Sequence, residues 1–147
     1  MLSQTVEYAL RAMVVLAGSA QARTAAQVAQ KSKVPVEYLF KVLQALTRAG
    51  LVTTHRGKRG GFSLARPPAL INLLDVVSSI DPIRRVNECP LGLRAHEREL
   101  CPLHRKLDDA ARLVEDAFRT TCLADLVGSP LPPPLCPGLE TIHVQTQ

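Results

Sequence analysis

The sequence predicts a mainly α-helical fold with a small β-hairpin, arranged as a winged helix-turn-helix domain followed by a long C-terminal helix. Apolar residues recur at the spacing of one helix face in several separate segments. A short helix, a tight turn and a third helix follow one another in the first third of the chain, as in a helix-turn-helix. The basic, glycine-rich run HRGKRGG at residues 55–61 then lies between two short apolar segments, which is typical of a hairpin with a wing-like tip.

The first two helices are predicted from apolar spacing and from a capping motif. Residues 4–19 would form an amphipathic helix, because one face carries Val6, Ala9, Leu10, Met13, Val14 and Ala17. Thr24 and Gln27 have the spacing of a capping box, in which each side chain accepts a hydrogen bond from the other residue's backbone N–H. This box would begin a second helix that extends to about Lys31.

The third helix would be the one that enters a groove. Residues 32–34 would make the turn before it. Pro35 suits its first turn, because proline lacks the N–H group that the start of a helix leaves unpaired. Gly50 would end it, since glycine readily adopts the left-handed conformation that follows many helices. Its buried face would consist of Leu39, Val42, Leu43 and Leu46.

A hairpin and a fourth helix are predicted next. Residues 51–54 and 62–65 have the composition of short strands on either side of the basic run. Pro67-Pro68 would close the hairpin, because proline cannot continue a strand ladder. Asn72 is a favourable N-cap residue, and we expect the helix after it to extend to about Ile80.

The C-terminal part is predicted to contain one long helix. Residues 81–100 have no clear period, whereas the segment from about Pro102 to Thr120 has an apolar stripe of Leu103, Leu107, Ala110, Ala111, Val114, Ala117 and Phe118. The pattern is equally consistent with packing of this helix on a second copy of the chain and with packing of the helix on its own domain. We therefore divide the chain into a winged domain (1–80), a cysteine-containing sensor loop (81–103), a dimerisation helix (104–127) and a Pro-rich flexible tail (128–147).

The composition indicates a single domain with a polyanionic partner. Of the 147 residues 46% are hydrophobic and 21% are charged, which is sufficient for a modest core. The net charge of +5, concentrated at residues 55–59, favours nucleic acid. No signal peptide is recognised, and the apolar run at residues 12–17 is too short to span a bilayer. We therefore expect a cytoplasmic protein with reduced thiols and no membrane partner.

Candidate DNA-binding residues lie on the outward face of the third helix. A helix fits the major groove, where residues near its N-terminus meet the base edges. Glu37 can accept a hydrogen bond from a cytosine amine, and Gln44 can bind adenine or a phosphate. Phe40 can contact a thymine methyl group, although a half-buried structural role is equally consistent with the sequence. Lys41 and Arg48 suit phosphates.

The basic tip of the hairpin supplies a second set of candidate DNA contacts. Arg56, Lys58 and Arg59 can flank the sugar–phosphate backbone or enter a minor groove. The glycines between and after them permit a tight turn and a close approach of the backbone. Each of these cations alone could be a solvated surface charge. Their clustering directly after a helix-turn-helix favours DNA.

Four segments of the sequence together resemble the bacterial IscR/NsrR-type winged-helix repressors. The resemblance covers about residues 1–127 and rests on VEYALRAM, VPVEYLFKVLQALTRAGLV, HRGKRGGFSLAR and INLLDVVSSI. It implies a homodimer, joined by the long C-terminal helix, that binds a palindromic operator in double-stranded DNA. It also implies that a [2Fe-2S] cluster can bind near the loop between the wing and that helix.

The resemblance also implies a set of metal ligands. Cys89 and Cys101 match the first and last cysteines of the family, and His104 matches a histidine that is a ligand in some members. Glu7 lies where some members place an acidic ligand that reaches the cluster from the other subunit. The family's middle cysteine is absent, and its place falls near Ala95, so the usual three-cysteine site is incomplete.

The sequence leaves other roles open for these residues. Glu7 can instead form an ion pair with Arg11 one turn later, and His104 can be an exposed residue near a helix start. The spacing C-x11-C-x2-H fits structural zinc poorly, but a cluster-free thiol switch between the two cysteines is conceivable. Cys122 favours a core position, and Cys136 belongs to the Pro-rich tail.

Three classes of function therefore compete. The first is a DNA-binding repressor that senses redox state, iron or nitric oxide through a cluster. The second is a cluster-free DNA-binding regulator that responds to a thiol oxidant, a metabolite or a protein. The third is a winged helix used only for protein contacts. We do not expect an enzyme, because no nucleophile–base arrangement, phosphate loop or paired catalytic carboxylates is recognised in the sequence.

Overall fold

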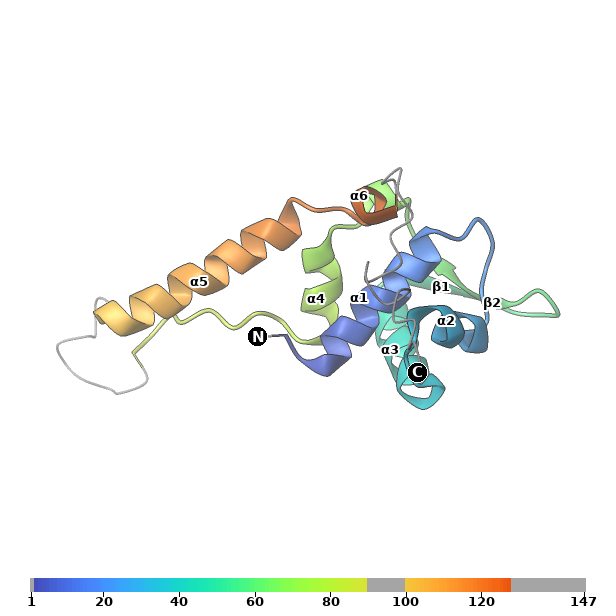
Figure 1. The fold of residues 1–147 in the computed structure, drawn as a ribbon, viewed down its shortest axis with the longest axis horizontal. Coiled ribbons are helices and arrows are strands. Elements are labelled where there is room, and N and C mark those ends of the chain that lie inside the picture. Colours follow the sequence, from blue (N-terminus) through green and yellow to red (C-terminus); the bar gives the residue numbers. More distant parts are fainter. Residues whose placement is uncertain (1, 90–99, 128–147) are drawn as a thin grey trace, which may run out of the picture.

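A computed structural model of the protein describes residues 2–89 and 100–127 (Figure 1). Seven of its elements belong to the first 80 residues: α1 (Gln4–Ala17), α2 (Ala25–Ser32), α3 (Val36–Arg48), β1 (Val52–His55), β2 (Gly61–Leu64), the 3-10 helix η1 (Pro68–Leu70) and α4 (Leu73–Ile80). Two helices follow, α5 (Pro102–Arg119) and α6 (Leu123–Val127). The hairpin β1–β2 and the helix α5 protrude at opposite ends of the molecule (Figure 1). This mainly helical architecture with one hairpin confirms the predicted fold class.

The helices begin at the capping residues that the sequence indicates. Thr24 caps α2 through a complete capping box, in which the Thr24 side chain accepts from the Gln27 N–H at 3.2 Å and the Gln27 side chain accepts from the Thr24 N–H at 3.0 Å. Asn72 caps α4 in the same way, with Asp75 as its partner. These bonds lie within four residues of sequence, so local chemistry determines where each helix starts.

The turn between α2 and α3 differs in detail from the expected one. Lys33 adopts the left-handed conformation, with a φ of 56°, and ends α2. Pro35 precedes α3 as its N-cap residue and does not lie within the first turn. The helix ends at Arg48, and Gly50 then takes a left-handed φ of 73°, in line with its expected role at the helix end.

One hydrophobic core unites the first four helices, the hairpin and α6. α1 lies at its centre and contacts α2, α3, α4, α6 and β2. All four apolar residues expected to be buried on α3 are buried. On α1 the buried face is turned slightly from the expected one, because Ala12 and Leu16 are buried whereas Leu10, Val14 and Ala17 are only half-buried. The core therefore holds α3 with its polar face outward.

The wing is a two-stranded antiparallel hairpin attached to the chain before α2. Val52 pairs with Leu64 and His55 pairs with Gly61, so the strands lie one residue away from the predicted bounds. Arg23 forms an isolated bridge with Phe62, through N–H···O distances of 2.9 and 2.7 Å between their backbones. This bridge joins the hairpin to the start of the helix-turn-helix.

The long helix expected from about Pro102 to Thr120 is α5 (Pro102–Arg119), and the segment 104–127 assigned to dimerisation also contains a second, short helix, α6. α5 ends at Arg119, and α6 folds back onto the body, where the Leu123 N–H donates to the Ile71 carbonyl at 2.9 Å. Cys122 between them is half-buried and pairs by its backbone with Asn72. Returning the chain through α6 anchors the end of the protruding α5 to the domain that carries α3.

Within residues 2–89 and 100–127, no helix combines the length and apolarity needed to cross a lipid bilayer.

Candidate DNA interface and metal site

The outward face of α3 carries the predicted DNA-reading residues. Five of them recur at intervals of three or four positions, which places them on one side of the helix, and all are exposed: Glu37, Phe40, Lys41, Gln44 and Arg48. Phe40 has 49% of its surface exposed, so its ring is available to an approaching groove. Among the residues that the structure describes, nothing covers this face, so it can contact another molecule.

A shallow groove lies between α3 and the hairpin. Its volume is about 460 Å³, and it is lined by Phe40, Gln44, Thr47, Arg48, Thr54 and Phe62. Three of these residues, Thr47, Thr54 and Phe62, have no sign in the sequence that would mark them for DNA contact. The groove arises only because the hairpin packs beside α3, which the pattern of one segment alone cannot reveal. Methyl and ring surfaces of this kind can receive a thymine methyl group.

The tip of the wing carries the three predicted cations. Arg56, Lys58 and Arg59 are exposed in the turn between β1 and β2. Gly57 has a φ of 101° there, a conformation that side chains other than glycine rarely adopt. A side chain at Gly60 would overlap the carbonyl oxygen of His55. The glycines thus permit a turn tight enough to present three cations on a narrow tip.

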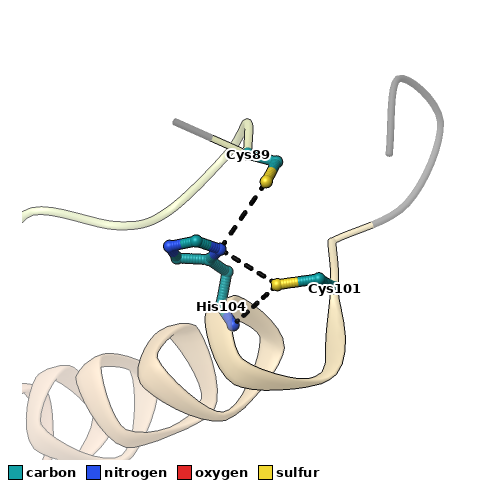
Figure 2. A group of neighbouring side chains, drawn as sticks. All are labelled: Cys89, Cys101 and His104. Carbon is teal, nitrogen blue, oxygen red and sulfur yellow. Dashed lines mark hydrogen bonds between the residues drawn. The ribbon is translucent and has the colours of Figure 1, made fainter. Parts of the chain in front are cut away.

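Cys89, Cys101 and His104 lie together at the start of α5 (Figure 2). Their donor atoms all lie within 4.8 Å of one another. The Nδ1 atom of His104 is 3.0 Å from the sulfur of Cys101 and 3.7 Å from that of Cys89. All three residues are half-buried, so they are shielded in part from water but reachable from outside. The fold therefore brings two thiols and an imidazole into one cluster, although Cys89 and His104 are 15 positions apart in the sequence.

The N-terminus of α5 positions two of the three donors. Cys101 is the N-cap residue, and its sulfur accepts from the His104 N–H at 3.5 Å. Pro102 follows at the first helical position, where the absence of an N–H costs nothing. The partial positive charge of a helix N-terminus favours a negative donor such as a thiolate. His104 lies one turn into the helix and directs Nδ1 back toward both sulfurs (Figure 2).

The third donor, Cys89, follows a segment that is attached to α5 by Arg85. The Arg85 Nε and Nη2 atoms each lie 2.6 Å from a carboxylate oxygen of Asp108, and Nη1 lies 3.2 Å from Glu115. The Val86 N–H also donates to Asp108, at 3.0 Å. Hydrogen bonds from Arg85, with the one from Val86, lower the pKa of Asp108 to about 2, and the pKa of Arg85 is raised in turn. The sequence gives no sign of this contact, because 23 residues separate the partners.

Glu7 lies apart from this cluster within the described chain. It is exposed in the first turn of α1 and forms an ion pair with Arg11, as the alternative interpretation of its sequence position expects. It does not belong to the group of Cys89, Cys101 and His104. Cys122 does not belong to that group either. Ala95, where the family's middle cysteine would fall, and Cys136 lie outside the described residues.

The donor set fits the cluster that the resemblance implies, but only in part. Thiolates supplemented by histidine are the ligands of iron–sulfur clusters, and a [2Fe-2S] cluster needs four protein donors. Cys89, Cys101 and His104 supply three donors of the right type in one place. A fourth donor does not join them among the residues that the structure describes.

A helix-turn-helix with an exposed third helix and a basic wing defines the winged-helix class of DNA-binding transcriptional regulators. Residues 2–129 match the Rrf2 family, whose description is iron-dependent transcriptional regulator, and the chain belongs to this family. The family consists of transcriptional regulators rather than enzymes. Two relatives are named as HTH-type transcriptional regulators. One from Aquifex aeolicus is 30% identical and covers 85% of this chain and 90% of its own length, and one from Mycobacterium tuberculosis is 35% identical and covers 89% and 83%.

Solved structures share the fold over most of the chain. CymR of B. subtilis, described as the global cysteine regulator, has a TM-score of 0.73 at 26% identity and covers 87% of this chain and 96% of its own. IscR of T. potens has a TM-score of 0.71 at 22% identity and covers 87% and 86%. The oxidised form of Staphylococcus aureus CymR has a TM-score of 0.67 at 23% identity and covers 86% and 95%. These similarities confirm the winged-helix fold.

Proposed function

We propose that the protein is a homodimeric transcriptional repressor that binds a palindromic operator and senses redox state, iron or nitric oxide through a [2Fe-2S] cluster. The observation that carries this proposal is the gathering of Cys89, Cys101 and His104 at the start of α5, which is the end of this helix farther from the winged domain (Figure 1). A sensor on α5 can influence how two copies of α3 are spaced, because α5 is in contact with α4. When bound, such a cluster would supply reversible electron transfer and reactivity toward nitric oxide.

DNA recognition is proposed to follow from the two exposed sets of side chains. Glu37, Phe40 and Gln44 would read base edges in the major groove. Lys41 and Arg48 would hold phosphates on either side of that groove. Arg56, Lys58 and Arg59 at the wing tip would bind the neighbouring backbone or minor groove. Two copies of α3 related by a two-fold axis would require an operator with matching symmetry.

The dimer is proposed to form through α5. Within the described chain this helix has no buried residue, and Leu103, Leu107 and Leu113 are each more than half exposed. Apolar surface of this extent on a protruding helix is typical of an interaction site. In such a dimer, Glu7 of the partner subunit would be the fourth ligand, and it would have to leave its ion pair with Arg11. The cluster site would then be complete only in the dimer.

A cluster-free thiol switch is the second candidate function. It is favoured by the two sulfurs of Cys89 and Cys101, which lie within 4.8 Å of each other before any metal is considered. A disulfide between them needs only a small movement, since bonded sulfurs lie about 2 Å apart. A regulator of this kind would respond to a thiol oxidant and would contain no iron.

Anaerobic purification separates the two candidates. We expect the fresh protein to absorb visible light and to contain equal amounts of iron and acid-labile sulfide. Cys89→Ala and Cys101→Ala should lose both, Glu7→Ala and His104→Ala should lose part, and Cys122→Ala should retain them as the matched control. Iron-free anaerobic protein would exclude the cluster and leave the thiol switch. Duplexes that the unaltered protein binds can be selected from a random library. If Cys89→Ala and Cys101→Ala both bind these duplexes as tightly as the unaltered protein under every redox condition, the sensing proposal is wrong.

A further inference from the structure

We propose that Arg85 is a positioning residue that clamps the Cys89 segment onto α5 and thereby sets the distance of the Cys89 thiol from Cys101 and His104. This inference depends on the proposed function in one respect, which is that Cys89, Cys101 and His104 act as one site. The clamp consists of Arg85, Val86, Asp108 and Glu115, and none of these residues is a ligand candidate.

The segment that carries Cys89 needs such an anchor. Residues 81–89 belong to no helix or strand, so no regular backbone ladder fixes them. Arg85 is attached to α5 by three hydrogen bonds from its guanidinium group, two to Asp108 and one to Glu115. The Val86 N–H adds a fourth bond, which ties the backbone itself to Asp108. The clamp therefore holds both a side chain and the main chain of this segment.

The clamp and the donor cluster lie along the same side of α5. Asp108 is four residues after His104, and Glu115 is seven residues after Asp108, and both spacings return to the same face of a helix. Arg85 is four residues before Cys89, so an extended chain between them can reach at most about 14 Å. Holding Arg85 at Asp108 thus restricts the Cys89 sulfur to the neighbourhood of His104, one turn away.

The geometry and burial of the clamp distinguish it from an ordinary surface ion pair. The side chains of Arg85, Asp108 and Glu115 are 32%, 20% and 18% exposed, so water screens them only in part. A two-pronged contact between guanidinium and carboxylate groups is both directional and strong. Lysine at this position would keep the positive charge but could not form the bidentate contact with both carboxylate oxygens of Asp108. The arginine itself, rather than a positive charge alone, is therefore needed.

A metal-free experiment tests the positioning role directly. In full-length protein with Cys122→Ser and Cys136→Ser, a glutathione redox buffer sets the equilibrium between the Cys89 and Cys101 thiols and their disulfide. Two protein thiols are oxidised to one disulfide as one glutathione disulfide is reduced to two glutathione thiols. We expect Arg85→Met to lower the effective concentration of the two thiols by about tenfold or more, because proximity would be lost. Arg85→Lys should lower it less, and Arg66→Met, at an exposed arginine of the winged domain outside α5, should not change it.

Titration with Co²⁺ provides the second readout, through the absorption bands of cobalt–thiolate bonds. We expect Arg85→Met to weaken Co²⁺ binding by roughly 10–100-fold, which is typical when a group that orients a ligand is removed. Equal thiol equilibria in Arg85→Met and the parent, or an equal loss in Arg66→Met, would overturn the clamp. If anaerobically purified parent protein contains no iron, the cluster function fails while the thiol equilibrium still decides the clamp. If the parent binds Co²⁺ and Arg85→Met binds it equally well, the clamp fails while the cluster function stands.

Discussion

At the residue scale, Gly61 constrains how the wing is attached to the body. Its φ of 147° lies in a region that residues with a side chain rarely adopt. A Cβ atom added there would overlap the carbonyl group of Arg23 and approach the N–H of Thr24. The next residue, Phe62, forms the backbone bridge to Arg23. The glycine therefore lets the hairpin approach the chain just before α2, beside the helix-turn-helix.

We expect Gly61→Ala to destabilise the protein by more than about 1 kcal/mol, because alanine would be strained at this φ and would clash with the Arg23 backbone. Urea unfolding followed by circular dichroism would measure the loss. Gly57→Ala is the matched control, since Gly57 also has a positive φ but a Cβ atom there would meet no atom within 4 Å. Equal losses in the two variants would show that the close approach at Gly61 contributes nothing beyond backbone strain.

At the level of elements, α3 and the hairpin divide the proposed DNA interface between them. α3 offers side chains that can bond to base edges, whereas the hairpin tip offers only cations. Contacts to phosphates release condensed counterions, so they weaken as the salt concentration rises. Contacts to base edges instead determine which sequence is preferred. The hairpin should therefore contribute mainly salt-dependent affinity for any DNA sequence, and α3 should contribute mainly the preference for one sequence.

We expect Arg56→Ala, Lys58→Ala and Arg59→Ala each to weaken binding to all DNA sequences alike. Each should also reduce the slope of log affinity against log salt by about 1, because each removes one phosphate contact. Fluorescence anisotropy at several salt concentrations would measure the slopes. Lys106→Ala is the control, since Lys106 is an exposed cation on α5, away from the wing. Wing variants with an unchanged slope would argue against phosphate contacts at the tip.

Elements of this fold could be predicted from sequence where local chemistry determines them. Thr24 and Asn72 mark helix starts because the bonds that cap a helix lie within four residues. The face of α3 could be predicted from the spacing of Leu39, Val42, Leu43 and Leu46 for the same reason. The exception is Lys33, which ends α2 in the left-handed conformation although it is not a glycine.

Contacts between distant segments could not be predicted in this way. The Arg23–Phe62 bridge and the contact of Arg85 with Asp108 and Glu115 join residues that are 23 to 39 positions apart. Neither has a periodic pattern or a motif, because each depends on how whole elements pack. The cluster of Cys89, Cys101 and His104 was expected only through the family resemblance, since the spacing alone fits no standard metal motif well.

At the scale of the whole molecule, α5 is a helix whose apolar side chains the described residues leave largely uncovered. It projects from the body and contacts α4 (Figure 1). Leu107, Ala110, Ala111 and Val114 of α5 line a pocket of about 450 Å³, whose other wall is formed by residues 2–3 and 81–84. An open apolar pocket beside exposed leucines is costly in water. In the proposed dimer, a second copy of α5 would cover this surface.

We expect Leu107→Glu to convert the dimer into a monomer, because a charged side chain would replace a leucine at the proposed interface. Analytical ultracentrifugation would measure the molecular mass. Affinity for a palindromic duplex should fall by about a hundredfold or more, since two linked half-sites bind far more tightly than one. Leu70→Glu is the matched control, because Leu70 is also an exposed leucine (64%, against 51% for Leu107) and lies on η1, outside α5. A Leu107→Glu protein that stays dimeric, or a Leu70→Glu protein that dissociates as readily, would place the dimer interface elsewhere. If Leu107→Glu is monomeric, its affinity for a half-site shows directly how much of operator binding one winged domain supplies on its own.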